Sequence, residues 1–351
     1  MVSLVDSITN SLTRIQTAKT NIKAAIESKG VSVGNGLIDT YADKIREIED
    51  NFSFISQNGT RAAGLFQGMS ELKKVPDKCA LKQPTSFENM FKDCTVLEEA
   101  PELDTSEGTN FHGMFRNTKG IKEVPAYNTS KGTDFSDMFR GSKIETPPNI
   151  DTSKGQSFYR MFASANYLAS LPKLDTTETK NFGYMFNYCR RMVNEEEVVY
   201  EAGKCQNFSF MFNYCESMRV APIMNTWNGR VFAYMFYNCS SLVTIPKLYL
   251  TNTVEQYYDE NNMETYTCFY NAFSGCTNLE NITIQGTIWH NISFYGCNKL
   301  THESLMSIIN ALAHFSSSSK VYRYCQLGSA NLAKLTDEEK AIATNKGWTL
   351  Y

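Results

Sequence analysis

The sequence has few of the residues that build metal and catalytic centres. It contains only four histidines among 351 residues, and its ten cysteines never form a Cys-x-x-Cys pair, so zinc-ligand spacing is missing. No nucleophile elbow, phosphate-binding loop or paired-carboxylate motif occurs. We therefore expect no enzyme activity, no metal and no cofactor. The histidines, which stand far apart, are expected to be surface or core residues: His112, His290, His302 and His314.

The chain also lacks long apolar runs and a strong charge of one sign. No run approaches the roughly 18 apolar residues that span a bilayer, so membrane insertion is not expected. A formal net charge of -3 gives no pull toward nucleic acid. The start "MVSLVDSITNSLTRIQ" has no basic segment followed by an apolar block, as a secretory signal would have. We expect synthesis in a reducing cytoplasm and free cysteines.

A repeat dominates the sequence. Met-Phe pairs recur, and the steps between their phenylalanines are 24, 24, 23, 24, 26 and 24 residues. A period of this size lies in the roughly 20 to 29 residue range of leucine-rich solenoids. The phenylalanines of these pairs are the predicted repeat core: Phe91, Phe115, Phe139, Phe162, Phe186, Phe212 and Phe236.

Each repeat has three parts. Phe87, Met90, Phe91 and Cys94 stand at i, i+3, i+4 and i+7, which predicts one face of a short helical turn. The next stretch reads as extended and ends at a proline, and the following Asp-Thr-Ser and glycine read as a turn. Other copies replace Cys94 with Thr, Ser or Ala, so this site requires a small residue rather than a disulfide.

One repeat cannot bury its own apolar face, but stacked coils cover one another. The segment "FENMFKDCTVLEEAPELDTSEGTNF" resembles the BspA-like leucine-rich repeats, in which Met-Phe, Cys and Asp-Thr-Ser recur at such offsets. The resemblance implies an α/β repeat solenoid that is leucine-rich-repeat-like. We predict an N-terminal helical docking or oligomerisation module at 1–50, a solenoid of nine to ten coils at 51–300 and a C-terminal α/β cap at 301–351.

The two ends depart from the repeat. Apolar spacing predicts helices at 3–28 and 37–48, and "IQTAKTNIKAAIESKGVSVGNGLIDTYADKIREI" resembles an N-terminal module of tail and virion proteins of tailed bacteriophages. That resemblance implies docking to other virion proteins. At the C-terminus we predict two helices, with Thr301 as one N-cap and Thr336 with Glu339 as a capping box. The tail "GSANLAKLTDEEKAIATNKGWTL" also resembles the C-termini of phage-encoded repeat proteins.

One insertion is a candidate binding loop. The step from Phe236 to Phe273 is 37 residues, and the added segment is rich in tyrosine. Insertions in solenoids become loops on one face, which is often the binding face, and tyrosine gives a large contact area at low entropy cost. Packing of these tyrosines on adjacent coils is the alternative. The predicted contact residues, with one turn tryptophan that replaces the usual Ser or Thr, are Tyr249, Tyr257, Tyr258, Tyr266 and Trp227.

These features predict a bacteriophage virion structural protein of fibre or tail type. Its N-terminus would attach to the particle, and its solenoid would contact a host-surface glycan or protein. We expect a homo-oligomer, because projecting virion parts usually have closed symmetry. The alternative is a bacterial cell-surface adhesin with the same repeats, which would require a secretory start. An intracellular interaction scaffold is a third class.

Overall fold

The computed structural model describes Thr17, Thr20, Asn21 and residues 62–75, 83–194, 197–260, 263–315 and 322–351. The chain divides into two units, Met1–Phe54 and Ile55–Tyr351. The helices predicted at 3–28 and 37–48, and with them the docking module at 1–50, fall outside the described residues, apart from the three named first.

Regular secondary structure is sparse and comes late in the described chain. The strands are β1 Val199–Tyr200, β2 Ile223–Met224, β3 Thr244–Tyr249, β4 Gln256–Asp259, β5 Glu264–Thr267, β6 Asn281–Gln285, β7 Ile292–Ser293, β8 Arg323–Gln326 and β9 Trp348–Leu350. The helices are α3 His302–Ala311, α4 Ser329–Leu332 and α5 Asp337–Asn345. Strands pair in parallel as β1 with β2, β3 with β6 and β7-β8-β9, whereas β4 and β5 pair antiparallel.

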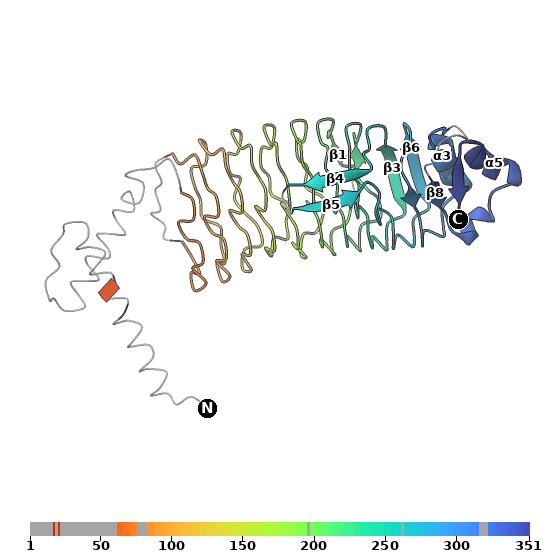
Figure 1. The fold of residues 1–351 in the computed structure, drawn as a ribbon. Coiled ribbons are helices and arrows are strands. Elements are labelled where there is room, and N and C mark those ends of the chain that lie inside the picture. Colours follow the sequence, from red (N-terminus) through yellow and green to blue (C-terminus); the bar gives the residue numbers. More distant parts are fainter. Residues whose placement is uncertain are drawn as a thin grey trace, which may run out of the picture. The chain divides into compact units, whose positions relative to one another are not determined.

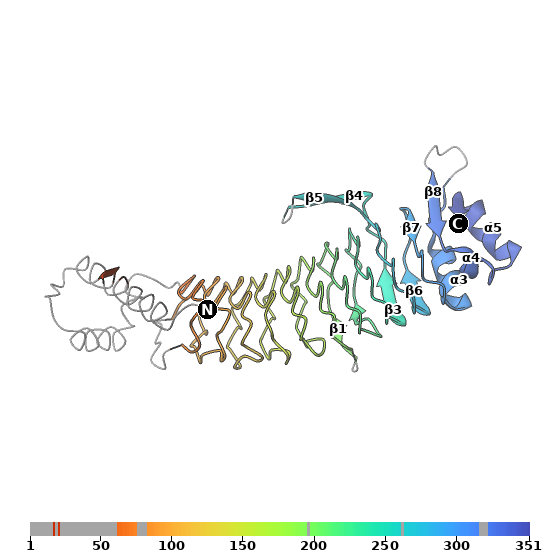
Figure 2. The same cartoon turned by 90° about the horizontal axis from the view of Figure 1, so that it is seen from below.

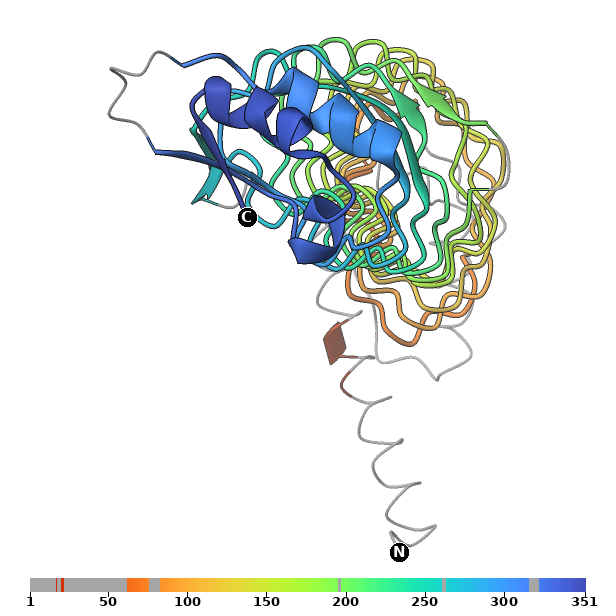
Figure 3. The same cartoon turned by 90° about the vertical axis from the view of Figure 1, so that its right-hand side faces the viewer.

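Successive copies of the repeat stack as coils (Figures 1 and 2). We call the described residues between 62 and 300 the coil stack. A parallel bridge joins the same position of each coil to the next, through Ser86, Asn110, Asp134, Ser157, Asn181, Asn207 and Val231. Viewed along the stack, the coils superpose, and α3 and α5 lie across its C-terminal end (Figure 3).

The seven phenylalanines of the Met-Phe pairs form a column inside the stack. All are fully buried. Consecutive rings stack with centroids 5.4–5.7 Å apart and planes within 12°. Because one coil contributes one ring to this column, each ring is covered by the rings of the neighbouring coils, as expected of a repeat that cannot bury its apolar face alone.

The predicted helical turn is wrong. The N–H of Asn89 donates to the carbonyl of His112 in the next coil at 2.7 Å, whereas the N–H of Met90 donates to Phe87 within its own coil at 3.1 Å. This alternation continues through Phe91 and requires left-handed backbone at Asn89, where φ is 55°. Two successive tight turns thus place the same side chains inward as a helix would, but they leave every second N–H for the neighbouring coil. Among the described residues, the repeats contain no α-helix, and the α/β character belongs to the C-terminal segment alone.

Where the small residue after the Met-Phe pair is a cysteine, it links neighbouring coils, whereas the hydroxyl of Thr118 bonds to Phe115 within its own coil. The thiol of Cys94 donates to the carbonyl of Phe66 at 2.9 Å, and the thiol of Cys239 donates to that of Phe212 at 3.0 Å. Nine cysteines of the described chain are free and buried, as predicted, and Cys79 lies outside the described residues. A thiol fits because it is small and still offers a weak donor to a buried carbonyl.

The Asp-Thr-Ser turn is confirmed, and its threonine has a defined task. In the copy at 128–130, the Asn128 side chain accepts from the N–H of Ser130, which closes the turn. The buried hydroxyl of Thr129 donates to the carbonyl of Asp151 in the next coil at 2.7 Å. The turn therefore also joins coils.

This bond gives a stability prediction. Thr129→Val keeps the shape of the side chain but leaves the Asp151 carbonyl without its hydroxyl donor, so we expect a loss of about 1–2 kcal/mol in the free energy of unfolding. Ser130→Ala, at a partly exposed residue whose hydroxyl donates only to Asn128 within the same turn, is the control and should cost less than about 0.5 kcal/mol. Urea denaturation followed by circular dichroism measures both. Equal costs for the two variants would contradict the assigned bond.

The C-terminal segment covers the end of the coil stack and also hydrogen-bonds to its last backbone groups. The hydroxyls of Ser304 and Ser307 on α3 accept from the N–H groups of Ile282 and Ile284 on β6, at 3.0 and 2.8 Å. These side chains thus take up the free N–H groups at the edge of β6, to which a further coil would otherwise pair. Thr301 caps α3 and Thr336 forms a capping box with Glu339, both as predicted.

Candidate contact surface

The insertion after the coil at 236 forms an antiparallel hairpin of β4 and β5 that runs along the stack toward earlier coils (Figures 1 and 2). Tyr266 holds the hairpin against the coil stack, because its ring packs on Val231 and Ala233 and its hydroxyl lies 2.9 Å from that of Tyr184. Asp259, which is fully buried, accepts a hydrogen bond from Asn207 at 3.4 Å. The hairpin is therefore fixed to coils that precede it by some 30 to 80 residues in sequence.

The predicted contact residues lie in two places. On the hairpin, Tyr258 is half exposed, Tyr257 is partly buried against the coil stack and Tyr266 is buried at 7% exposure. Trp227 and Tyr249 form a separate edge-to-face pair, with ring centroids 6.1 Å apart, and Trp227 is half exposed. Tyr266 thus packs locally, whereas Tyr258 and Trp227 offer area to a partner.

Two rows of aromatic side chains run along the stack, and sequence reasoning missed both. The hairpin row consists of Tyr184, Phe210 and Tyr234, whose neighbouring rings stack at 4.3 and 4.5 Å. These three residues pack against Tyr266, through a hydroxyl contact for Tyr184 and through the hydrophobic cluster for the other two. The hairpin row is therefore the surface on which the hairpin packs.

The open row consists of Tyr188, Tyr214 and Tyr237. Tyr188 and Tyr214 stack at 4.7 Å, and Tyr237 meets Tyr214 edge-on at 5.6 Å. The Arg190 guanidinium lies 5.4 Å from both of the stacked ring centroids. All three tyrosines are partly exposed. Tyr234 of the hairpin row meets Tyr237 edge-on at 5.4 Å, but among the described residues no ring of β4 or β5 stacks on the open row.

The backbone beneath the stacked rings is strained. Tyr188 and Tyr214 are left-handed, with φ of 63° and 58°, at a position where the earlier coils place Asp93, Asn117, Gly141 and Ser164. A left-handed residue that is not Gly, Asn or Asp costs roughly 1–2 kcal/mol, of which ring stacking returns about 0.5–1.5 kcal/mol. Tyr184, Phe210 and Tyr234 of the hairpin row have the same left-handed backbone, and there the rings pack against the hairpin. The open row combines such strained aromatic residues with an arginine, and both residue types are enriched in binding hot spots.

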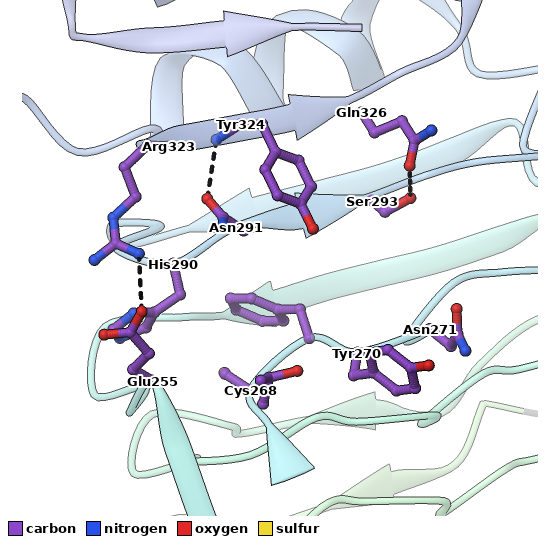
Figure 4. Close-up of a pocket in the computed structure, with 12 residues that line it drawn as sticks. Glu255, Cys268, Tyr270, Asn271, His290, Asn291, Ser293, Arg323, Tyr324 and Gln326 are labelled. Atoms are coloured by element: carbon purple, nitrogen blue, oxygen red, sulfur yellow. Dashed lines mark hydrogen bonds and ion pairs between the residues drawn. The ribbon is translucent and has the colours of Figure 1, made fainter. Parts of the chain in front are cut away.

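Two hollows flank the hairpin. One, of about 420 Å³, is polar and lies beside β4, where Tyr257 and Tyr258 face Gln206 and Arg230. The other, of about 230 Å³, lies at the hairpin base against β7 and β8 and is drawn in Figure 4. No group of three or more metal-ligand side chains occurs in the described ranges. Over the same ranges, no helix has the length and apolar character needed to cross a bilayer.

This fold defines a repeat protein of stacked coils with an aromatic surface. The chain belongs to the family described as "Mycoplasma protein of unknown function, DUF285", whose model matches residues 60–166, 85–198, 109–227 and 145–249 and so covers more than half of the chain. The match supports the resemblance to BspA-like leucine-rich repeats, whereas the phage origin stays a prediction.

A leucine-rich repeat protein from Bacteroides ovatus, known from a crystal structure, is 14% identical to this chain. The alignment covers 82% of this chain and 86% of that protein, with a TM-score of 0.23. No match is found among curated proteins.

Proposed function

We propose that this protein is a contact protein of a bacteriophage particle, in which the coil stack presents the open row and the exposed hairpin residues to a host-surface glycan or protein. The observation that supports contact is the pair Tyr188 and Tyr214, aromatic side chains on strained backbone beside Arg190. Tyr258 and Trp227, both half exposed, extend the contact residues. Residues 1–50 attach the protein to other virion proteins, and the protein forms a homo-oligomer.

Mass spectrometry and immunogold labelling of purified particles test the location. We expect the protein in washed particles, at a copy number that is a multiple of its oligomeric state. Recombinant full-length protein should also compete with particles for adsorption to host cells. Detection only in membranes of uninfected cells would contradict the virion role while leaving the contact role intact.

A bacterial cell-surface adhesin is the second candidate, and the family match favours it because the family description names a cellular bacterium. Both candidates use the same surface, so they differ in location rather than in contact chemistry. Immunogold labelling of intact uninfected cells separates them: surface label without any phage genes expressed supports the adhesin.

A further inference from the structure

The pocket at the hairpin base contains a buried cation with an incomplete set of partners. Arg323 enters it from β8, and its side chain is 9% exposed. Its Nη1 reaches the Oε1 of Glu255 at a long 3.4 Å, and the Glu255 side chain is 67% exposed. The buried Nε of Arg323 has no hydrogen-bond partner among the described residues. A buried guanidinium normally has its donors paired, because desolvating an unpaired charged donor is costly.

A second unpaired nitrogen belongs to His290, which also lines this pocket. The Nε2 of His290 lies 3.1 Å from the carbonyl of Thr253, which can only accept, so Nε2 carries the proton. Burial, with a smaller contribution from the Arg323 charge, lowers the pKa of His290, so its ring is neutral near pH 7. The buried Nδ1, which has no partner in the described chain, is then an acceptor.

The other residues that line the pocket are suited to binding a small polar ring such as a monosaccharide. Tyr270 and Tyr324 supply aromatic faces, and Asn291 and Gln326 are already oriented by bonds to the backbone of Tyr324 and to Ser293 (Figure 4). At about 230 Å³ the pocket is smaller than the roughly 300–1,000 Å³ of sites for drug-sized ligands. It has room for one monosaccharide-sized group.

We propose that this pocket binds an acidic sugar unit, that is, a carboxylate or phosphate carried next to a hydroxyl. The anion accepts from Arg323, and the hydroxyl donates to Nδ1 of His290, which a movement of the surrounding side chains exposes when the ligand binds. Glu255, exposed at the mouth, competes with the ligand for the guanidinium and swings aside when the ligand binds. The pocket has no lining residue in common with the open row. Binding in this pocket can therefore be tested independently of whether the protein belongs to a phage particle or to a cell surface.

Saturation-transfer NMR on full-length protein, with thermal unfolding as a check on folding, tests this site. The probes are glucuronate, glucose 6-phosphate and neutral glucose. We expect a dissociation constant of about 1 mM for at least one acidic sugar, because such a ligand makes only a few hydrogen bonds and one charged contact. Glucose, which lacks the charge, should bind at least roughly tenfold more weakly. The two acidic probes distinguish a carboxylate ligand from a phosphate ligand. Equal binding of glucose and both acidic sugars would overturn the proposal.

Three variants assign the contacts. Arg323→Gln should weaken binding about 10- to 100-fold, the usual worth of charge-assisted hydrogen bonds. Glu255→Gln, at an exposed site that tolerates change, should strengthen binding about two- to fivefold by freeing the guanidinium. His290→Ala should weaken glucuronate binding and leave binding of acetate, which has no hydroxyl, unchanged. An unaltered glucuronate affinity in Glu255→Gln would show that the ion pair is merely structural and would overturn the assignment even if Arg323→Gln failed to fold.

Discussion

The protein is expected to unfold cooperatively once the pH rises above about 9, the range in which thiols of an unfolded chain ionise. Nine cysteines of the described chain are buried inside the coil stack and the C-terminal segment. Burial raises the pKa of every one of them, to about 12 for Cys205 and Cys325. The folded protein therefore keeps these thiols neutral at a pH at which the unfolded chain releases their protons.

The sign follows from proton linkage. Above the unfolded thiol pKa, the unfolded state binds fewer protons than the folded state, so stability falls as the pH rises. Each fully buried thiol contributes up to about 1.4 kcal/mol per pH unit above that pKa. Several such thiols together therefore lower the free energy of unfolding by an amount comparable with the whole stability of a domain. Burial also raises the pKa of Tyr200, which acts in the same direction at still higher pH.

Circular dichroism between pH 7 and about 11, with urea titrations at each pH, measures the effect. The slope of the free energy of unfolding against pH gives the number of protons released. Cys205→Ala is the matched control, because it removes one buried thiol and should reduce that number by one. A stability that stays level through pH 10 would contradict the buried, neutral thiols.

Phe139→Ala is expected to lower the free energy of unfolding by about 3–5 kcal/mol. The ring is fully buried and stacks on Phe115 and Phe162 at 5.7 and 5.4 Å. Its removal opens a cavity and breaks two stacking contacts, and because each coil touches only its neighbours, no other element can fill the gap.

Tyr167→Ala removes a ring of similar size from a site that is 44% exposed, and it provides the control. We expect it to cost less than about 1 kcal/mol, since mainly surface cation–π contacts with Lys143 and Arg191 are lost. Both variants are measured by urea denaturation. Similar costs for the two would mean that Phe139 does not lie in a packed interior.

The spacing of residues in the sequence predicts those parts of the fold in which the same repeat position is buried in every coil. The regular Met-Phe pairs locate the interior column, and the exchange of Cys94 for Thr118 or Ser142 locates a buried site for small residues. Caps at Thr301 and Thr336 are local bonds between residues three apart, so the local sequence contains all that is needed to place them.

The same spacing misplaces the backbone. An i, i+3, i+4, i+7 pattern fits a helix, but it fits two tight turns equally well. The deciding signal is the residue directly before the Met-Phe pair, which is Asn89 in this copy and Gly113 and Asp137 in the next copies, all types that tolerate left-handed backbone. Tyr184 at the same place in a later copy obscures that signal.

The surface and the pocket depend on contacts that no local pattern contains. Tyr266 is buried because its hydroxyl meets Tyr184, 82 residues away. The pocket joins Glu255, His290 and Arg323 from three separate segments, and the expectation that each histidine is a surface or satisfied core residue did not foresee an unpaired Nδ1.

The open row is tested most directly by a double substitution, Tyr188→Asn with Tyr214→Asn, which installs the residue type that Asn117 provides in an earlier coil. Relief of left-handed strain, worth roughly 1–2 kcal/mol per residue, offsets the lost stacking, so the unfolding midpoint should stay within a few degrees of the parent. Binding of the labelled full-length protein to host cells is the measurement. We predict a loss of at least about tenfold, the effect of removing two hot-spot aromatics. A folded double variant that binds host cells as tightly as the parent would contradict contact through this surface.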